Sequence, residues 1–222
     1  MPIYNAPILS VDPMETRRYA GLQKADFDQE LIDNACMEAR LLIKPRGIWN
    51  IYDYDASAQM VLPGGIVLQG QSIGRHLHNS CKIAVLCATI GEDIENQVTR
   101  SFAEGRYSFS VLLDAAATTA IEEVADGMEK SILSAANRQG LSMTWRFSPG
   151  YGDWPIEQQP EVLWLSHGDK IGVSLTEALM LTPRKSVTAV IGLFHQDKSC
   201  TASASRHNCS ICSRQNCPAR KI

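Results

Sequence analysis

The sequence predicts an α+β domain with a mainly antiparallel, twisted sheet flanked by helices, followed by a cysteine-rich C-terminal tail. Strand-like and helix-like segments follow one another without a regular βαβ rhythm, which disfavours a parallel sheet. One long stretch has helical periodicity throughout. The composition changes sharply near the C-terminus, so we divide the chain into an α+β domain, residues 1–197, and a metal-binding tail, residues 198–222.

The composition is that of an ordinary globular protein. Of the 222 residues, 45% are hydrophobic and 20% are charged, and this length can bury a core of useful size. The formal net charge of -3 gives no sign of a nucleic-acid or anionic-membrane partner. No apolar run approaches ~18 residues, and residues 1–10 lack the pattern of a secretory signal. We therefore predict a cytoplasmic protein.

Two helices are predicted near the N-terminus. Asp12-Pro13 opens a short helix that ends at Gly21, because proline suits a first helical turn and glycine stops a helix. Asp26 or Asp28 caps a second helix. Its apolar residues recur at helical spacing: Leu31, Ala35, Ala39, Leu42 and Ile43.

Strands dominate the next segment. Residues 48–54 form a strand, and residues 61–68 form a hairpin because a Pro-Gly-Gly turn separates two apolar pieces. Residues 72–77 form a short helix. Residues 82–90 are a continuous apolar run, which is typical of a strand buried on both faces. A helix follows over residues 91–103.

The longest predicted element is a helix over residues 108–138. Its apolar residues lie three or four apart and form one stripe: Leu113, Ala117, Ile121, Val124, Met128, Ile132 and Ala135. Four acidic residues lie largely off this stripe and form a solvated face, unless one of their carboxylates faces a ligand: Glu122, Glu123, Asp126 and Glu129.

After this helix we expect a short strand over residues 141–145, a helix over residues 155–164, and strands over residues 171–175 and 187–194. The sequence has no G-x-G-x-x-G fingerprint, so a dinucleotide-binding Rossmann unit is not expected.

The stretch Arg146-Phe147-Ser148-Pro149-Gly150-Tyr151 is the most informative part of the chain. Pro149 holds Ser148 extended, and Gly150 lets a ligand approach the main chain closely. Arg146 supplies a planar fork suited to a carboxylate, and Tyr151 supplies an aromatic face with a polar tip. These residues suit a zwitterionic ligand with an aromatic group, although they also describe an ordinary β-turn with a surface arginine.

The motif R-x-S-P-G-Y at residues 146–151 resembles the R-x-x-P-G-Y loop of the activation domain of cobalamin-dependent methionine synthase. The resemblance spans roughly residues 10–195 and implies the fold of that domain. Further pieces occur in the family's order: Pro45-Arg46-Gly47, Leu113-Asp114 to Asp126, Leu175-Thr176-Glu177, Pro183 and Ser186-Val187.

The resemblance implies a substrate and site residues. The loop would bind S-adenosylmethionine, with Arg146 on the methionyl carboxylate. The backbone of Ser148, Pro149, Gly150 and Tyr151 would hold the adenosine, with Tyr151 near the corrin. No catalytic side chain is implied, because the domain contributes mainly proximity and orientation.

The resemblance also implies a reaction and partners. The chain would be a methyltransferase component that supports reductive methylation, and so reactivation, of an oxidised cobalt(II) corrinoid. The cobalamin would lie on a partner, either methionine synthase or a related corrinoid methyltransferase, because the chain has no D-x-H-x-x-G motif. A flavodoxin- or ferredoxin-like protein would supply the electron. Gly152-Asp153-Trp154-Pro155 departs from the family pattern and leaves the identity of the partner open.

The tail has a metal-site composition. Residues 198–222 contain no Asp or Glu and cannot bury a core of their own. A metal would supply the missing folding energy, and both zinc and an iron–sulfur cluster accept four thiolates. We predict one of these at four cysteines, with His207 as an alternative ligand: Cys200, Cys209, Cys212 and Cys217. The tail departs from the family and leaves two alternative functions, a non-catalytic corrinoid-docking module and a metal or electron-transfer protein.

The remaining cysteines and two histidines are predicted to be structural. Cys36, Cys81 and Cys87 lie in apolar helix or strand patterns and are expected in or near the core. His76 and His78 are two residues apart on a short helix, so their side chains diverge, and we expect both at the surface.

Overall fold

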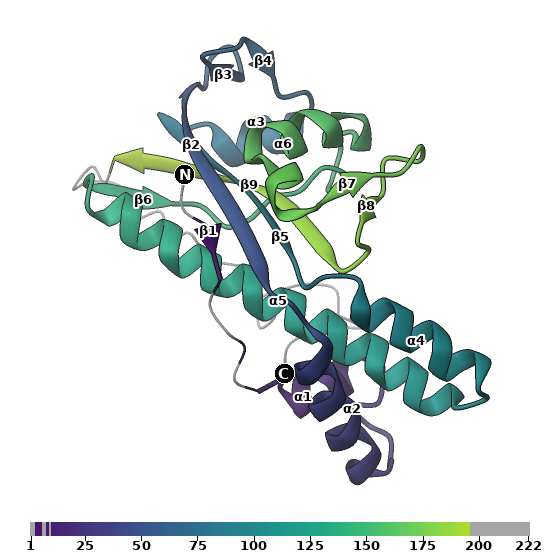
Figure 1. Cartoon of the computed structure of the whole chain (residues 1–222). Helices are drawn as coiled ribbons and strands as arrows, with labels where there is room; N and C mark the ends of the chain where they lie inside the picture. Colours follow the sequence, from purple (N-terminus) through teal and green to yellow (C-terminus); the bar gives the residue numbers. More distant parts are fainter. Residues whose placement is uncertain (1–2, 6–7, 9, 196–222) are drawn as a thin grey trace.

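An antiparallel sheet is the central layer of the computed structural model (Figure 1), which describes residues 3–5, 8 and 10–195. The strand order is β4-β3-β2-β5-β9-β6, with β1 paired to β2, and every pairing is antiparallel. The predicted fold class is therefore confirmed. The strands are β1 Ile3–Tyr4, β2 Arg46–Asp55, β3 Met60–Leu62, β4 Ile66–Val67, β5 Lys82–Thr89, β6 Leu141–Met143 and β9 Ser186–His195.

The central strand β5 is buried on both faces of the sheet, as its continuous apolar run predicts. It pairs with β2 on one side and β9 on the other. Because successive side chains of a strand point to opposite faces, neighbouring residues of β5 enter different cores. Leu86 packs in the larger core beneath the long helix, and Val85 packs in a smaller core on the other face.

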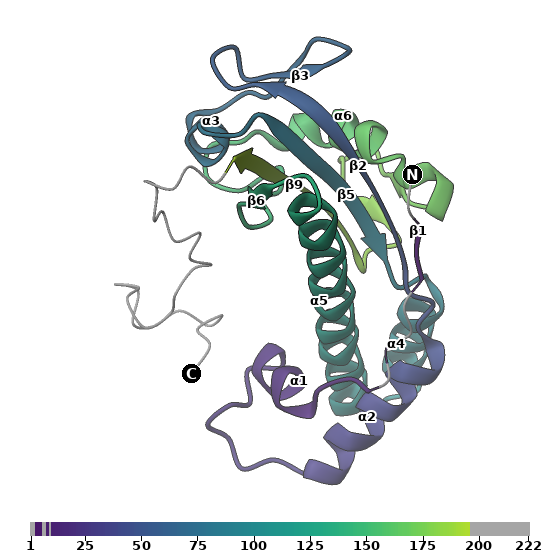
Figure 2. The same cartoon turned by 90° about the vertical axis from the view of Figure 1, so that its left-hand side faces the viewer.

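The long helix α5, Tyr107–Asn137, crosses one face of the sheet and continues beyond it (Figure 2). Its extension packs against α1, Pro13–Tyr19, α2, Gln29–Leu42, and α4, Asp93–Ala103. All seven residues of the predicted apolar stripe are buried. The helix thus joins two parts of the fold, the sheet and the small cluster of helices α1, α2 and α4.

Local capping fixes where the N-terminal helices begin. The Asp12 carboxylate accepts a hydrogen bond from the Met14 backbone N–H at 2.7 Å, and Asp28 accepts one from Glu30 N–H at 3.0 Å. These carboxylates satisfy backbone donors that have no partner inside the helix. Of the two predicted caps for the second helix, the structure uses Asp28.

The opposite face of the sheet carries shorter elements. Helix α3 spans Gln71–Leu77, and α6 spans Gln159–Ser166 after a 3₁₀ turn. A small hairpin of β7, Ser174–Leu175, and β8, Leu181–Thr182, completes this layer. The predicted strand over residues 171–175 is thus too long, because the chain forms a 3₁₀ turn through Ile171 before β7 begins.

The structure confirms the predictions for Cys36, Cys81 and Cys87 and one of the two histidine predictions. Cys36 and Cys87 are buried and Cys81 is half-buried, as expected. The prediction of two surface histidines is right for His78 and wrong for His76, whose ring is buried beneath the segment that follows β6.

The predicted tail ligands Cys200, Cys209, Cys212 and Cys217, with His207, lie outside the described residues. Within the described part of the chain, no group of His, Cys, Asp or Glu could hold a metal ion. No helix in that part is long and apolar enough to cross a membrane.

Leu86 provides a test of the core. Its side chain is fully buried in the centre of β5, so Leu86→Ala removes packing atoms and leaves a cavity. We expect a loss of about 2–5 kcal/mol in the free energy of unfolding, measured by urea titration. Leu41→Ala is the control, since Leu41 is 79% exposed on α2, and it should change stability by less than about 0.5 kcal/mol. Equal effects of the two variants would contradict the described core.

Candidate functional site

A cleft of ≈ 980 Å³ lies where the segment after β6 faces α1 across the middle of α5. Its walls come from three separate parts of the sequence: the first helix, the middle of the long helix, and the predicted ligand loop. The start of α3 adds one residue. The lining residues are Asp12, Glu15, Tyr19, Ser72, Thr119, Glu122, Glu123, Asp126, Glu129, Trp145, Arg146, Phe147, Gly150, Tyr151 and Gly152.

The loop wall of the cleft is fastened to β9. Phe147 and Val190 exchange two backbone hydrogen bonds, at 2.9 and 2.8 Å. The Ser148 hydroxyl donates to the carbonyl of Thr188 at 2.7 Å. Gly150 has a φ of 89°, a conformation that other residues resist, and its N–H donates to the Trp154 carbonyl at 2.8 Å. The predicted Pro-Gly corner is therefore a rigid turn anchored on the sheet.

An aromatic cluster supports the loop from beneath. The Phe147 ring stacks on His76 and Trp154, with centroids 5.0 and 6.0 Å away, and meets Tyr151 edge-on at 5.8 Å. His76 Nε2 lies 2.9 Å from the Trp145 carbonyl, so this nitrogen donates and the ring is held in one tautomer. Burial lowers the pKa of His76. The loop thus rests on a neutral imidazole.

Asp153 ties the loop to α3. Its carboxylate accepts hydrogen bonds from the backbone N–H groups of Gln71 at 2.9 Å and Ser72 at 2.7 Å. These are orphan donors of the first helical turn, so Asp153 caps a helix that lies far away in sequence. Gly152 approaches the same turn so closely that an added Cβ would lie 2.6 Å from the Ser72 hydroxyl. Gly152 and Asp153, which depart from the family pattern, therefore hold the loop against the start of α3.

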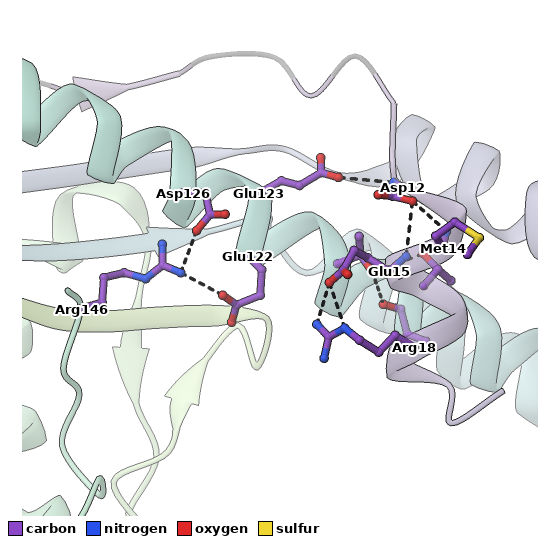
Figure 3. Close-up of polar contacts among 11 residues, drawn as sticks. Asp12, Met14, Glu15, Arg18, Glu122, Glu123, Asp126 and Arg146 are labelled. Atoms are coloured by element: carbon purple, nitrogen blue, oxygen red, sulfur yellow. Dashed lines mark hydrogen bonds and ion pairs between the residues drawn. The ribbon is translucent and has the colours of Figure 1, made fainter. Parts of the chain in front are cut away.

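Arg146 lines the cleft and points toward carboxylates of α5 (Figure 3). Its Nη2 lies 3.0 Å from a carboxylate oxygen of Glu122 and 3.0 Å from one of Asp126. Its Nε is 3.6 Å from Glu129, which also accepts the Arg146 backbone N–H at 3.3 Å. Only 17% of the side chain is exposed. The remaining nitrogen, Nη1, is buried and has no hydrogen-bond partner in the described part of the chain.

The acidic residues of α5 are not simply a solvated face, which corrects that interpretation. Glu129 is 5% exposed, Glu123 and Asp126 are half-buried, and Glu122 is exposed. Glu122, Asp126 and Glu129 are spaced by four and three residues, so they share one side of the helix. That side turns toward Arg146, and the carboxylates hold the guanidinium in place.

The α1 wall is fastened to α5 independently. Glu123 accepts a hydrogen bond from the Asp12 backbone N–H at 3.3 Å, and the Thr16 hydroxyl donates to that of Thr119 at 3.2 Å in the core. Burial raises the pKa of Glu123, and the negative charges of Asp12 and Asp126 raise it further.

The structure brings three of the five predicted binding residues to the cleft. Arg146, Gly150 and Tyr151 line it. Ser148 and Pro149 do not: the Ser148 hydroxyl is bonded to β9, and Pro149 is buried. The sequence reasoning assigned no ligand-binding role to the acidic residues of α1 or to Tyr19. The spacing of Glu122, Asp126 and Glu129 could have indicated their pairing with Arg146, because it places three carboxylates on one side of a helix.

One comparison with known proteins supports the fold described above. No family model matches the sequence, and no curated protein matches it. A solved structure described as the MetH reactivation domain bound to AdoHcy matches with a TM-score of 0.59 and 14% identity, covering 95% of this chain and 83% of that one. At this identity the likeness establishes the fold, which agrees with the fold implied by the loop motif.

The cap made by Asp153 predicts a pH dependence. Hydrogen bonds from the Ser72 hydroxyl and from the Ser72 and Gln71 backbones lower the pKa of Asp153 to about 2. A carboxyl whose folded pKa is depressed stabilises the fold above its unfolded pKa, and this contribution is lost as the pH falls through the folded value. Wild type should therefore be more stable than Asp153→Asn near neutral pH, and the difference should shrink between about pH 4 and pH 2.

Urea unfolding of both proteins across this pH range measures the effect. A stability difference that stays constant down to about pH 2 would show that the Asp153 carboxylate is not the cap.

Proposed function

We propose that the chain binds S-adenosylmethionine in this cleft and presents its methyl group for reductive reactivation of a corrinoid on a partner methyltransferase. The observation that carries the proposal is Arg146: its Nη1 is buried without a hydrogen-bond partner in the described residues, in a cleft of a reactivation-domain fold. A buried donor without a partner is costly, and a ligand carboxylate would satisfy it.

The cleft suits each part of the proposed ligand. Arg146 would take the methionyl carboxylate through Nη1, because Nη2 and Nε already face α5 carboxylates. Tyr151, which is 58% exposed, and Phe147 offer aromatic surface for the adenine. The carboxylates opposite can accept hydrogen bonds from the ligand's ammonium and ribose groups. AdoHcy, bound in the similar structure, is the demethylated form of this ligand.

The chain itself would contribute by holding the methyl donor in a fixed position. The corrinoid on the partner would be the methyl acceptor, and a flavodoxin- or ferredoxin-like protein would supply the electron. A fixed donor converts an encounter into an intramolecular step, and a loop anchored on β9 and α3 is suited to that task. The partner we propose is methionine synthase or a related corrinoid methyltransferase.

A reconstituted assay tests the proposed function. The protein is mixed with a cobalt(II) corrinoid methyltransferase, a reduced electron donor and S-adenosylmethionine labelled in its methyl group. We expect label on the corrinoid only when all components are present. Binding of S-adenosylmethionine without transfer of its methyl group to any corrinoid protein would instead indicate the non-catalytic docking function.

Arg146 provides the sharpest test of the binding site. Arg146→Ala should weaken S-adenosylmethionine binding by about 1.5–3 kcal/mol, the scale of a hydrogen bond to a charged group, measured by calorimetry. Arg146→Lys keeps the charge without the fork and should recover only part of the affinity. Arg75→Ala is the control, because Arg75 is an exposed arginine of α3 that does not line the cleft. Unchanged affinity in a folded Arg146→Ala protein would refute the assignment.

The tail is a separate proposal. We expect Cys200, Cys209, Cys212 and Cys217 to bind zinc or an iron–sulfur cluster, because the segment cannot form a core without a metal. Anaerobic purification followed by counting of iron, sulfide and zinc tests it. A colourless protein with bound zinc would rule out an electron-relay role, and a metal-free tail would rule out the site.

A further inference from the structure

The segment that carries Arg146 follows β6 through a β-bulge. Met143 at the end of β6 faces Leu193, and Phe147, four residues later, faces Val190, which is three residues back along β9. Three residues before Phe147 therefore stand opposite two of β9, so one residue is extra, and Arg146 lies in this stretch. A bulge interrupts the hydrogen-bond ladder and can re-aim a side chain, and bulges are frequent beside functional sites.

The peptide group between Trp145 and Arg146 is held from both ends by helices. Its carbonyl, which belongs to Trp145, accepts a hydrogen bond from His76 Nε2 on α3 at 2.9 Å, and its N–H, which belongs to Arg146, donates to Glu129 on α5 at 3.3 Å. The two helices pack on opposite faces of the sheet. Because a peptide group is planar and rigid, these two bonds fix its orientation. They thereby fix the direction in which the Arg146 side chain leaves the backbone.

The His76 ring also contacts the residues on either side of Arg146. It stacks on Phe147 with ring centroids 5.0 Å apart and meets Trp145 edge-on at 4.7 Å. Phe147 and Trp145 line the cleft, whereas His76 does not and is only 9% exposed. His76 can therefore act on a ligand only through the residues that do line the cleft.

Packing alone does not account for a histidine at this position. Its Nδ1 is buried and has no hydrogen-bond partner in the described part of the chain, which is a cost that a phenylalanine ring of similar shape would avoid. What the imidazole adds is the Nε2 donor. The Trp145 carbonyl also accepts from the Thr144 hydroxyl, at a longer 3.3 Å. The distinctive contribution of His76 is thus its hydrogen bond to the peptide group beside Arg146.

We propose that His76 is a positioning residue: its bond to the Trp145 carbonyl aims the Arg146 guanidinium so that Nη1 meets the ligand carboxylate. The inference rests on the proposed function and names a residue that acts through Arg146. Loss of this bond should weaken the binding only of ligands that carry the carboxylate, because the proposed adenosine contacts do not involve the Arg146 side chain.

Two substitutions separate the hydrogen bond from the ring. His76→Phe keeps an aromatic ring and removes the donor, whereas His76→Gln loses the ring and keeps an N–H donor at the same number of bonds from Cα. Calorimetric titration of the full-length chain with S-adenosylmethionine should show an affinity about three- to tenfold weaker in His76→Phe, and within about twofold of wild type in His76→Gln. A role in packing alone predicts the reverse order.

A ligand without the carboxylate shows whether the effect passes through Arg146. Decarboxylated S-adenosylmethionine lacks only that group, so its affinity should be the same in His76→Phe and in wild type. In an Arg146→Ala background, His76→Phe should cause no further loss of S-adenosylmethionine affinity, because residues that act as one unit are not additive. A loss that is equal for both ligands would show a general structural role and overturn the assignment.

His78→Phe is the matched control, because His78 is exposed and lies outside the cleft, and both affinities should be unchanged. Unchanged S-adenosylmethionine affinity in His76→Phe would overturn the positioning role and leave the proposed function standing. Should His76→Phe not fold, near wild-type affinity in His76→Gln supports the role, and a loss there overturns it. If the wild-type protein binds neither ligand, the proposed function itself fails, and this inference fails with it.

Discussion

The ion pairing between Arg146 and the carboxylates of α5 is the interaction on which the site depends. It joins the loop that follows β6 to carboxylates of α5 that lie between 17 and 24 residues earlier in the chain. Burying a guanidinium is costly unless its nitrogens are paired, and Glu129 meets both the side chain and the backbone of Arg146. The loop is therefore fixed in the position where the remaining nitrogen, Nη1, can meet a ligand.

The rest of the loop is built to keep that geometry. The exchange of hydrogen bonds between Phe147 and Val190 extends the sheet by one bridge, and the Asp153 cap fixes the far end of the turn on α3. His76 and Trp154 fill the space beneath. A site placed on a loop needs such support, because positioning errors of about an ångström are enough to weaken binding and catalysis.

The long helix gives the cleft its second wall. Because α5 extends beyond the sheet (Figure 2), it can hold α1 opposite the loop through the Glu123 and Thr119 contacts. Carboxylates of α5 thus hold Arg146, and neighbouring residues of the same helix, Thr119 and Glu123, hold the N-terminal segment. This arrangement concentrates carboxylates along one cleft, and it explains why Glu123, Asp126 and Glu129 are partly or largely buried.

The sequence by itself determined the elements and the chemistry of the loop. The apolar run of β5, the stripe of α5 and the cap at Asp12 are local patterns, and local periodicity and capping decide such features. The R-x-S-P-G-Y motif suggested a ligand only through its resemblance to the family loop, and its own residues also fit an ordinary turn. Only the tertiary structure decided which partners Arg146 has, that His76 is buried, and that Asp153 caps α3. These depend on contacts between residues far apart in the chain, and no local pattern specifies which distant surfaces meet.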